Sequence, residues 1–512
     1  MRLAALHLLL LTAAAPGEQF EFGRKRRCSN YEDWSKIPHS PASKGKLALP
    51  FQRPPEECRT FTSPAVEAKL SEVKAKIKDP DTARLWENAF PNTLDTTIKY
   101  HAPGAEPLSF IVTGDIDAEW LRDTEHQLGS YLSVLRELPK HEVTLEPLSD
   151  LIKGAIALQA RYVSRSPQCN AFQAPPESGI LAQSSNHGDA VLPYASPYFT
   201  FECKYELDSL ASFLGLSNKY YAATKDDSFI THEWRTAVAR LLKFVNRTTV
   251  GTINEETGEH NKEPYSFRRW TNLGSETHWN HGSGMPVRYT GMARSWFRPS
   301  DDACVYQFFV PANAQMSVEL KRVAEYYDTD AGKFAGKLGK QIGDAVWEHA
   351  VVDHPVFGKV FAYEVDGFGS HLFMDDANLP SLLSLPDLGF VSASDKTYQR
   401  TRQMVTSHQG NPYYIKGKYF EGIGGPHVGL RSAWPMSRIV AMRTTDDLEE
   451  IRGHLKAVVT STKGLGLVHE SVNVDTDQYS RPWFAWANSE FAKSIIDLEK
   501  RGLLEKATNN LL

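Results

Sequence analysis

Apolar residues recur every three to four positions through most of the chain after residue 60. The segment 65–79, for example, places Val66, Leu70 and Val73 on one side of a helix. The same pattern predicts further helices over 119–137, 146–163, 205–223, 231–246, 302–327, 332–351, 376–385, 396–406, 433–443, 446–459 and 486–504. Glycine- and proline-rich loops separate these segments. The chain is therefore predicted to consist mainly of helices.

Signals for strands are few and short, as at 109–113 and 359–365. The stretch 167–200 is too long for a routine connection, so it is predicted to form a functional loop or a small hairpin. No break in composition divides the helices, and 61–512 is predicted to be one all-α domain. The simplest arrangement is a double ring of six helix pairs, an (α/α)6 barrel with short β-hairpin insertions in its loops. Loops at one end of this six-hairpin toroid are expected to form the site.

The first residues have the features of a secretory signal peptide. One arginine precedes an apolar run through Leu11, and small residues follow at 13–15, so residues 1–18 are predicted to be removed. The segment 19–60 is polar and contains a basic run at 24–27. No later segment reaches the roughly 18 apolar residues that a membrane-spanning helix needs. The protein is therefore expected to be secreted or to reside in the secretory pathway, with no membrane attachment after removal of the signal.

The five cysteines fit passage through an oxidising compartment. Cys28 is predicted to pair with Cys58 and Cys169 with Cys203, which leaves Cys304 as a buried thiol. Spacing alone leaves other pairings open. The sequon at Asn246 is a candidate N-glycosylation site at the end of a helix.

Composition and charge narrow the possible functions. The chain is 41% hydrophobic and 23% charged, which is ordinary for a globular protein. Its net charge of −5 provides no basic face for a polyanion, so nucleic acid is not an expected partner. The 11 Trp and 20 Tyr suit both core packing and stacking on sugar rings.

The stretch 295–309, SWFRPSDDACVYQFF, carries the strongest candidate chemistry. Asp301 and Asp302 stand where a turn is predicted to enter a helix, with Ser300 as the helix cap. Capping accounts for one acidic residue and leaves the second, with its crowded aromatic neighbours, unexplained. A further carboxylate, Glu470, lies between His469 and Ser471 and precedes the aromatic block 483–486. Two carboxylates in aromatic settings are what hydrolysis of a glycosidic bond requires.

Other loops offer rival acids and a possible metal site. The segments 113–123, 364–369 and 422–427 combine glycines with carboxylates or histidine, and 374–380 adds two further carboxylates. All four can accept hydrogen bonds from hydroxyl groups. His278 and His281 lie close together, but no helical HExxH motif or CxxC pair accompanies them. This loop is interpreted as a substrate loop or a structural turn. No metal or other cofactor is expected.

Nine stretches, in order, are similar to glycoside hydrolase family 125, the metal-independent exo-α-1,6-mannosidases. They are 92–97 (NTLDTT), 113–123 (TGDIDAEWLRD), 205–209 (YELDS), 297–303 (FRPSDDA), 364–369 (EVDGFG), 374–386 (MDDANLPSLLSLP), 422–427 (GIGGPH), 469–471 (HES) and 483–489 (WFAWANS). The resemblance extends over nearly the whole chain after the N-terminal segment. One such match would be weak evidence, but nine in order are specific.

The resemblance implies an (α/α)6 barrel and hydrolysis with inversion at the anomeric carbon. An Asp of FRPSDDA would protonate the leaving oxygen, and Glu470 would activate water on the opposite face of the sugar. Between the two aspartates, Asp301 is favoured and Asp302 remains open. The like charge of the neighbour is expected to raise the pKa of the acid. Glu470 has to stay ionised, with hydrogen bonds expected from His469 or Ser471.

The expected substrate is a mannose-containing oligosaccharide or N-glycan, bound by a monomer. The residues chosen to hold the sugar are Asp115, Trp120, Arg122, Asp123, Arg298, Asp375, Asp376, Asn378, His427 and Asn488. Trp296 and Trp483 are further candidates for stacking on sugar rings, with core packing as the alternative. Three rival functions remain: an inverting α-glucosidase of the glucoamylase type, a mannose-binding barrel without activity, and a metal-dependent mannosidase.

Overall fold

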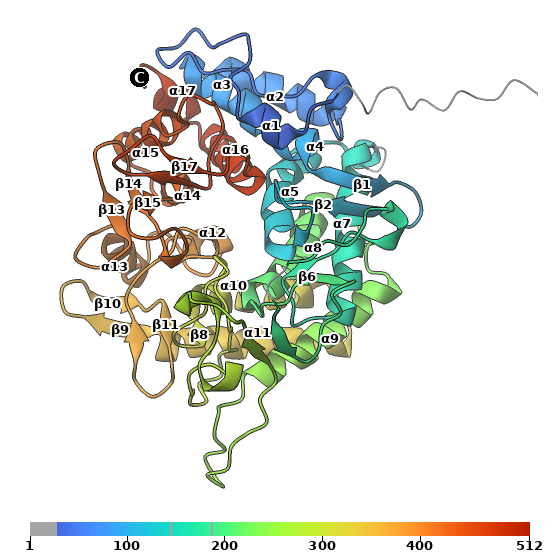
Figure 1. Ribbon diagram of the computed structural model, residues 1–512, viewed down its shortest axis with the longest axis vertical. Helices are drawn as coiled ribbons and strands as arrows, with labels where there is room; N and C mark the ends of the chain where they lie inside the picture. Colours follow the sequence, from blue (N-terminus) through green and yellow to red (C-terminus); the bar gives the residue numbers. More distant parts are fainter. Residues whose placement is uncertain (1–27, 144–145, 186–187) are drawn as a thin grey trace, which may run out of the picture.

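The computed structural model describes residues 28–143, 146–185 and 188–512. The predicted signal peptide, 1–18, lies outside the described residues. In Figure 1 the elements follow one another around the molecule, so that the last long helix, α16, lies beside α5 and α3. Helices dominate, as the apolar periodicity predicts. Within the described residues no helix is long and apolar enough to cross a membrane.

The helices are α1 (Tyr31–Ser35), α2 (Pro64–Lys76), α3 (Pro80–Ala89), α4 (Asn92–Thr96), α5 (Leu121–Glu137), α6 (Lys140–Val143), α7 (Pro147–Arg165), α8 (Leu207–Thr224), α9 (His232–Thr248), α10 (Val310–Tyr326), α11 (Asp330–His349), α12 (Leu385–Leu388), α13 (Lys396–Val405), α14 (Pro435–Arg443), α15 (Leu448–Thr460), α16 (Ala485–Lys500) and α17 (Leu504–Thr508). Short 3₁₀ turns lie at Glu56–Cys58, Pro176–Ser178, Gly274–Glu276, Asn280–Gly282 and Pro426–Val428.

The strands are β1 (Ile98–Ala102), β2 (Leu108–Ile111), β3 (Glu119–Trp120), β4 (Ala171–Phe172), β5 (Ala190–Leu192), β6 (Thr200–Glu202), β7 (Ser266–Arg268), β8 (Phe308–Phe309), β9 (Val351–His354), β10 (Gly358–Phe361), β11 (Glu364–Val365), β12 (His371–Leu372), β13 (Tyr414–Lys416), β14 (Glu421–Ile423), β15 (Ser432–Ala433), β16 (Ser471–Asn473) and β17 (Tyr479–Ser480).

Two sets of long helices differ in burial. Most residues of α5, α8, α10, α14 and α16 are buried, and these inner helices pack on one another: α16 on α5, α5 on α8, α8 on α10, and α14 on α16. The short α12 packs on α10. The outer helices α9, α11, α13 and α15 bury only one face. This difference follows from the sequence. A helix with a single apolar stripe buries only that side against the core, and its polar side faces solvent.

The starts of the two sets also differ. Side chains of Thr231, Thr329, Asp395 and Asp447 cap the outer helices α9, α11, α13 and α15. No side-chain cap begins the inner helices α5, α8, α10, α14 and α16. The residues at these inner starts are instead aromatic or acidic. Their side chains do not cap a helix and are therefore free to contribute to a site.

Short antiparallel sheets join the loops. The sheet β15–β16–β17 holds the segment directly after Glu470, and β3–β4–β6 holds the start of α5 beside the loop that leads to α8. A third sheet, β12–β11–β8, lies just before α10. All three sheets are built from strands of two or three residues. Their role is to fix loops at the starts of the inner helices.

Two disulfides join the predicted cysteine pairs. Cys28 is bonded to Cys58 and Cys169 to Cys203, whereas Cys304 is a buried free thiol. The described part of the polar N-terminal segment packs against the helices: Arg53 forms a buried ion pair with Asp95 at 2.7 Å. The boundary at residue 60 stays a prediction. Asn246 is exposed in the last turn of α9, as predicted, and its glycosylation is untested.

Two predicted helices are wrong in position. The helix expected over 302–327 begins at Val310, so Asp301 and Asp302 lie in a turn before it. The turn persists because Glu364 accepts the backbone N–H groups of Val305 and Tyr306, which a helix would have used. The helix expected over 376–385 is replaced by a loop and the short α12. There Asp375 accepts the N–H groups of Leu382 and Leu383.

Candidate active site

A pocket opens where the inner helices begin. Trp120, Trp434 and Phe484, which directly precede α5, α14 and α16, line it. Because these helices all start at the pocket, the positive ends of their dipoles converge there. The full lining consists of Thr113, Ile116, Trp120, Arg122, Asp123, Pro299, Ser300, Asp301, Asn378, His427, Trp434, Glu470, Arg481, Phe484 and Trp486. Asp301 and Glu470, remote in sequence, therefore share one pocket.

Asp301 enters the pocket from a strained turn. Its φ angle is 66°, in the left-handed region that few residues other than glycine, Asn and Asp adopt. The turn is closed by hydrogen bonds from the Asp301 N–H to the Arg298 carbonyl (2.9 Å) and from the Arg298 N–H to the Asp302 carbonyl (2.8 Å). Backbone strain of this kind is concentrated at functional sites. Here it aims one carboxylate of the pair at the pocket.

The neighbouring Asp302 has a different environment. It is buried and does not line the pocket. Its Oδ2 accepts a hydrogen bond from the Ser300 hydroxyl at 2.9 Å and lies 4.0 Å from Nδ1 of His427. The Ser300 hydroxyl therefore bonds to Asp302 and does not cap a helix. The geometry favours Asp301 as the residue that meets a ligand.

Glu470 is held in place by two hydrogen-bond partners. Its Oε2 accepts a hydrogen bond from the Ser480 hydroxyl at 2.8 Å, and its Oε1 accepts one from Nε of Arg481 at 3.2 Å. Arg481 has a left-handed φ of 48° and also pairs with Asp115. The result is a carboxylate in a polar setting with a permanent positive charge beside it, as a general base requires.

The expected partners of Glu470, His469 and Ser471, do not contact it. The ring nitrogens of His469 lie 3.1 Å from the backbone carbonyls of Arg481 and Thr462. The Ser471 hydroxyl lies 2.8 Å from the Ser480 hydroxyl, so it acts on Glu470 only through Ser480. The prediction was wrong because Ser480 of β17 and Arg481, which follows it, bond to the Glu470 carboxylate in place of its neighbours in sequence.

A buried cluster of charges lies behind Asp301. Arg122 Nη1 contacts Glu206 Oε2 at 2.5 Å and Asp208 Oδ2 at 3.2 Å, and Arg122 Nε lies 3.4 Å from Asp123. Lys204 is also buried, 3.5 Å from Glu202 and near Asp301. We define the pocket cluster as Arg122, Asp123, Lys204, Glu206, Asp208 and Asp301. It contains four carboxyl groups and two basic groups, an excess of acid.

The pKa values of these carboxyls follow from that excess. Burial, with the charges of Asp301 and Asp208, raises the pKa of Glu206 well above its usual range despite the opposing charge of Arg122. Burial likewise raises the pKa of Asp208 to about 6 and raises that of Asp123. For Asp301, the loss of solvent is outweighed by Lys204, Arg122 and a hydrogen bond from Glu206, which lower its pKa to about 2.

This result corrects one prediction from the sequence. The charge of Asp302 was expected to raise the pKa of Asp301, but the dominant charges around Asp301 are positive and come from Lys204 and Arg122. The carboxyl that holds a proton is instead its hydrogen-bonded neighbour, Glu206. A proton is therefore present beside Asp301, on a residue 95 positions earlier in the chain.

Three tryptophans of the pocket have unused hydrogen-bond donors. The indole N–H groups of Trp120, Trp434 and Trp486 are buried and have no acceptor among the described residues. Each such donor costs about 1–3 kcal/mol when buried without a partner. The guanidinium of Arg122 lies over the ring of Trp486 at 5.2 Å. A ligand rich in hydroxyl oxygens suits this lining, with aromatic faces for its C–H surfaces.

The structure separates the predicted sugar-binding residues into two groups. Trp120, Arg122, Asp123, Asn378 and His427 line the pocket, and Asp115 reaches its edge through Arg481. The others lie outside the lining: Arg298, Asp375, Asp376 and Asn488. Trp296 and Trp483 are buried in aromatic packing against Tyr205 and Tyr31, respectively.

Residues outside the lining hold the loops that form the pocket. Arg298 donates from Nε to Glu364 at 2.6 Å, and Glu364 in turn binds the backbone of the Asp301 turn. Asp376 accepts both the N–H and the side-chain amide of Asn378. Asn488 exchanges hydrogen bonds with the backbone of Val468, close to Glu470. Burial raises the pKa of Asp375 to about 8, and its oxygens bind the loop before α12.

No metal-binding arrangement is found among the described residues: three or more His, Cys, Asp or Glu side chains do not gather as ligands there. His278 is buried against the ring of Phe297, 4.7 Å between centroids, and burial lowers its pKa to about 3. The loop 278–281 therefore has a structural role around the Asp301 turn. It also contains two left-handed residues, Asn280 and His281.

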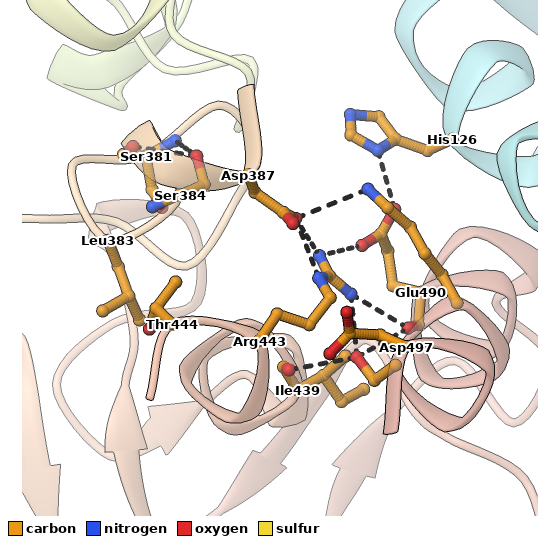
Figure 2. A network of polar contacts seen from close by, with 12 residues as sticks. His126, Ser381, Leu383, Ser384, Asp387, Ile439, Arg443, Thr444, Glu490 and Asp497 are labelled. Carbon is orange, nitrogen blue, oxygen red and sulfur yellow. Dashed lines mark hydrogen bonds and ion pairs between the residues drawn. The ribbon is translucent and has the colours of Figure 1, made fainter. Parts of the chain in front are cut away.

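A second buried network lies further along the same helices. Figure 2 shows Arg443 at the end of α14 between Asp387 of α12 and Glu490 of α16, with His126 of α5 on the other side of Glu490. Arg443 Nη2 lies 2.6 Å from Asp387 and 2.5 Å from Glu490. We define the paired cluster as Glu125, Lys219, Glu319, Arg322, Asp387, Arg443, Glu490 and Lys493. It contains four carboxyl groups and four basic groups.

Comparisons with known proteins give a consistent result. The model of the family described as metal-independent alpha-mannosidase (GH125) matches residues 79–496. The "Meiotically up-regulated gene 157 protein" of Schizosaccharomyces pombe is 48% identical over 483 residues, which is 93% of each chain. A solved Streptococcus pneumoniae structure from a family of metal-independent alpha mannosidases is 31% identical, with a TM-score of 0.76. That match covers 86% of this chain and 99% of the bacterial one, which was solved in a non-productive complex with alpha-1,6-mannobiose.

Some pocket residues were not predicted from the sequence as site residues. Trp434, Arg481 and Trp486 line the pocket, and Glu206 lies behind Asp301. One signal was present: Glu206 and Asp208 stand two positions apart in the YELDS stretch, where a helix begins. The pairing of Arg481 with Glu470 had no such signal, because it depends on a tight turn at the end of β17.

Proposed function

The chain belongs to family GH125, the metal-independent alpha-mannosidases, and on this premise we propose that it is an inverting exo-acting enzyme. In this proposal it removes terminal α-1,6-linked mannose from oligosaccharides or N-glycans. The linkage is supported by the bacterial relative, whose complex contains alpha-1,6-mannobiose. The observation that carries the proposal is that Asp301 and Glu470 line one pocket, with Lys204 and Arg122 near the first and Ser480 and Arg481 bonded to the second.

The proposed roles follow from those settings. Asp301 protonates the glycosidic oxygen as the bond to C1 breaks, and Glu470 removes a proton from the water that attacks C1 from the opposite face. Arg481 and Ser480 orient the Glu470 carboxylate. After one turnover the acid has lost a proton, the base has gained one, and exchange with solvent restores both. No step requires a metal.

The site also supports exo action. In the proposed (α/α)6 barrel, α5, α8, α10, α12, α14 and α16 form the inner ring, and residues at the starts of α5, α14 and α16 line the pocket. A terminal sugar enters such a pocket, whereas the rest of the chain stays outside. Trp120, Trp434 and Trp486 offer their N–H groups, and Asn378 and His427 offer further polar contacts to the hydroxyls.

The cellular setting is part of the proposal. The predicted signal peptide and the two disulfides support a place in the secretory pathway or outside the cell. Asn246 is the proposed glycosylation site, and the enzyme is proposed to act as a monomer.

A substrate panel tests this function. Wild-type enzyme treated with a chelator is expected to release mannose from α-1,6-mannobiose, and to release far less from α-1,2- and α-1,3-mannobiose. The Glu470→Gln variant keeps the shape of the side chain and serves as the control without a base. Release of glucose from maltose or isomaltose without release of mannose would show that the enzyme is an α-glucosidase and would refute the proposal. Undiminished activity of Glu470→Gln would refute the role of Glu470.

A further inference from the structure

The acid side of the pocket contains two carboxyls that share a hydrogen bond. Asn170 Nδ2 lies 3.0 Å from Oε1 of Glu206 and 3.4 Å from Oδ1 of Asp301, so one amide holds both side chains. A hydrogen bond also joins Glu206 to Asp301 directly. Two ionised carboxylates that contact the same amide repel each other strongly in a buried site. The geometry therefore requires a proton between them.

The surrounding charges decide where that proton rests. Glu206 is completely buried among Asp208, Asp301 and Arg122, whereas Asp301 is partly exposed to the pocket near Lys204, Arg122, His427 and Arg481. Asp123 adds a further negative charge from α5. The more negative surroundings are those of Glu206. The resting proton therefore lies on Glu206, which donates to an ionised Asp301.

A general acid that rests ionised needs a source for its proton. We propose that Glu206 is the positioning residue that stores the proton which Asp301 delivers to the leaving oxygen. This inference rests on the proposed function, because it assumes that Asp301 is the acid. It goes further in assigning a role to a residue that lines no part of the pocket.

The proton transfer balances without any further reactant. As the glycosidic oxygen gains negative charge, the proton moves from Glu206 to Asp301, and the Asp301 proton moves to that oxygen while the C1–O bond breaks. Glu206 becomes a carboxylate that accepts from Arg122 (2.5 Å) and Asn170 (3.0 Å), both already in place. Glu470 holds the proton taken from water. Solvent then returns one proton to the Glu206–Asp301 pair.

The variant Glu206→Gln separates storage of a proton from support of the fold. Glutamine has the shape and charge of protonated Glu206 and still donates to Asp301, but it supplies no proton. Hydrolysis of α-1,6-mannobiose at pH 7 is expected to fall about 100-fold, within the usual range for loss of acid assistance. The loss is expected to shrink at pH 5, because solvent then protonates Asp301 more often. Hydrolysis of α-mannosyl fluoride, whose leaving group needs no proton, is expected to fall less than three-fold.

Two further variants complete the experiment. Asp208→Asn also removes a carboxyl that contacts Arg122, but it has no hydrogen bond to Asp301. It is expected to change both substrates by similar factors. Glu206→Asp retains a carboxyl and is expected to recover at least ten-fold of the mannobiose activity. An unchanged pH profile in Glu206→Gln, or equal losses on both substrates, would overturn the inference. If the wild type itself cleaves no α-1,6-mannobiose, the proposed function fails instead.

Discussion

The carboxyl groups of the pocket cluster and of the paired cluster are largely buried, and both clusters include residues of α5 and α8, yet the clusters differ in charge balance. In the paired cluster the side chains of Lys219, Arg322 and Lys493 are partly exposed. Around Arg122, four carboxyls face two basic groups, whereas around Arg443 and its neighbours four carboxyls face four basic groups. His126 and Trp486 lie between them, with ring centroids 5.3 Å apart. The distance between the clusters is about one turn of α5, from Arg122 to His126.

The pKa values of the two clusters move in opposite directions. In the paired cluster, burial is outweighed by Lys493 and Arg443, which lower the pKa of Glu490 well below its usual range, and the pKa of Asp387 is also lowered. In the pocket cluster, burial prevails and raises the pKa of Glu206 and of Asp208. Each cluster has one exception: burial raises the pKa of Glu319 within the paired cluster, and Lys204 and Arg122 lower that of Asp301 within the pocket cluster.

The comparison separates two uses of buried charge. A balanced network has no proton to give and contributes mainly to the arrangement of the helices. A network with too few basic groups keeps a proton at neutral pH, as acid catalysis requires. The number of basic partners distinguishes the catalytic side. Four changes test this contrast.

The largest effect is expected from Asp301→Asn. Asparagine tolerates the left-handed φ of 66°, so the turn should persist while the acid is lost. Hydrolysis of α-1,6-mannobiose is expected to fall by about 10³-fold or more, with a much smaller loss on α-mannosyl fluoride. Steady-state kinetics on the two substrates measure the difference. Asp302→Asn is the matched control, and a selective loss in that variant instead would transfer the acid role to Asp302.

In the paired cluster, removal of one cation should reduce stability. Arg443→Met leaves Asp387 and Glu490 with Lys493 as their remaining basic side chain apart from His126. Breaking a buried pair in this way costs about 3–5 kcal/mol, which chemical denaturation measures. Arg501→Met removes a partly exposed arginine paired with Asp497 and is expected to cost less than about 1 kcal/mol. Equal losses in the two variants would contradict the distinction.

The two clusters should also respond oppositely to pH. The pKa of Asp208 is about 6 when folded, above its unfolded value near 4, so its ionisation lowers stability as pH rises from about 4 to 6. Asp208→Asn is therefore expected to raise Tm by about 2–4 °C above pH 6 and to leave it unchanged near pH 4.

The paired cluster provides the opposite control. Since the pKa of Asp387 is lowered in the folded protein, its ionised form contributes stability that is present above pH 4 and is lost as pH falls. Asp387→Asn is expected to lower Tm at pH 7 and to have less effect in acid. Thermal melts of both variants at pH 4 and pH 7 test the prediction. The same sign for both would remove the contrast between the clusters.

The smallest effect is expected on the base side of the pocket. Ser480→Ala removes one hydrogen bond to Glu470 and leaves Arg481 in place. A bond of about 1 kcal/mol corresponds to roughly a five-fold loss in kcat/KM. Ser471→Ala, which reaches Glu470 only through Ser480, should lose less. A larger effect for Ser471→Ala would mean that Ser480 does not orient the base.

Much of this arrangement was predictable from the chain. The helical periodicity located the starts of α5, α14 and α16, which face the pocket, to within two residues. It failed at Asp301, because the apolar residues after 302 are read equally well as the start of a helix. The backbone of that turn is held by Glu364, more than 50 residues away.

The acid pair was harder to predict than the individual acids. Asp301 and Glu470 stand out by their neighbours in sequence. The role of Glu206, in contrast, depends on the packing of α8 against α5, which brings its carboxyl to Arg122. Likewise, charge balance is a property of a three-dimensional cluster. Counting acids and bases along the chain gives a net charge of −5 and no hint of where the excess lies.

The most direct test of the pocket as an inverting acid–base site is the anomer that it releases first. Proton NMR during the first minutes of α-1,6-mannobiose cleavage by the wild-type enzyme should show β-mannose ahead of the slow conversion to the α form. That result requires water to attack from the face opposite the leaving oxygen, with Asp301 and Glu470 on either side of the sugar. α-Mannose as the first product would contradict the account.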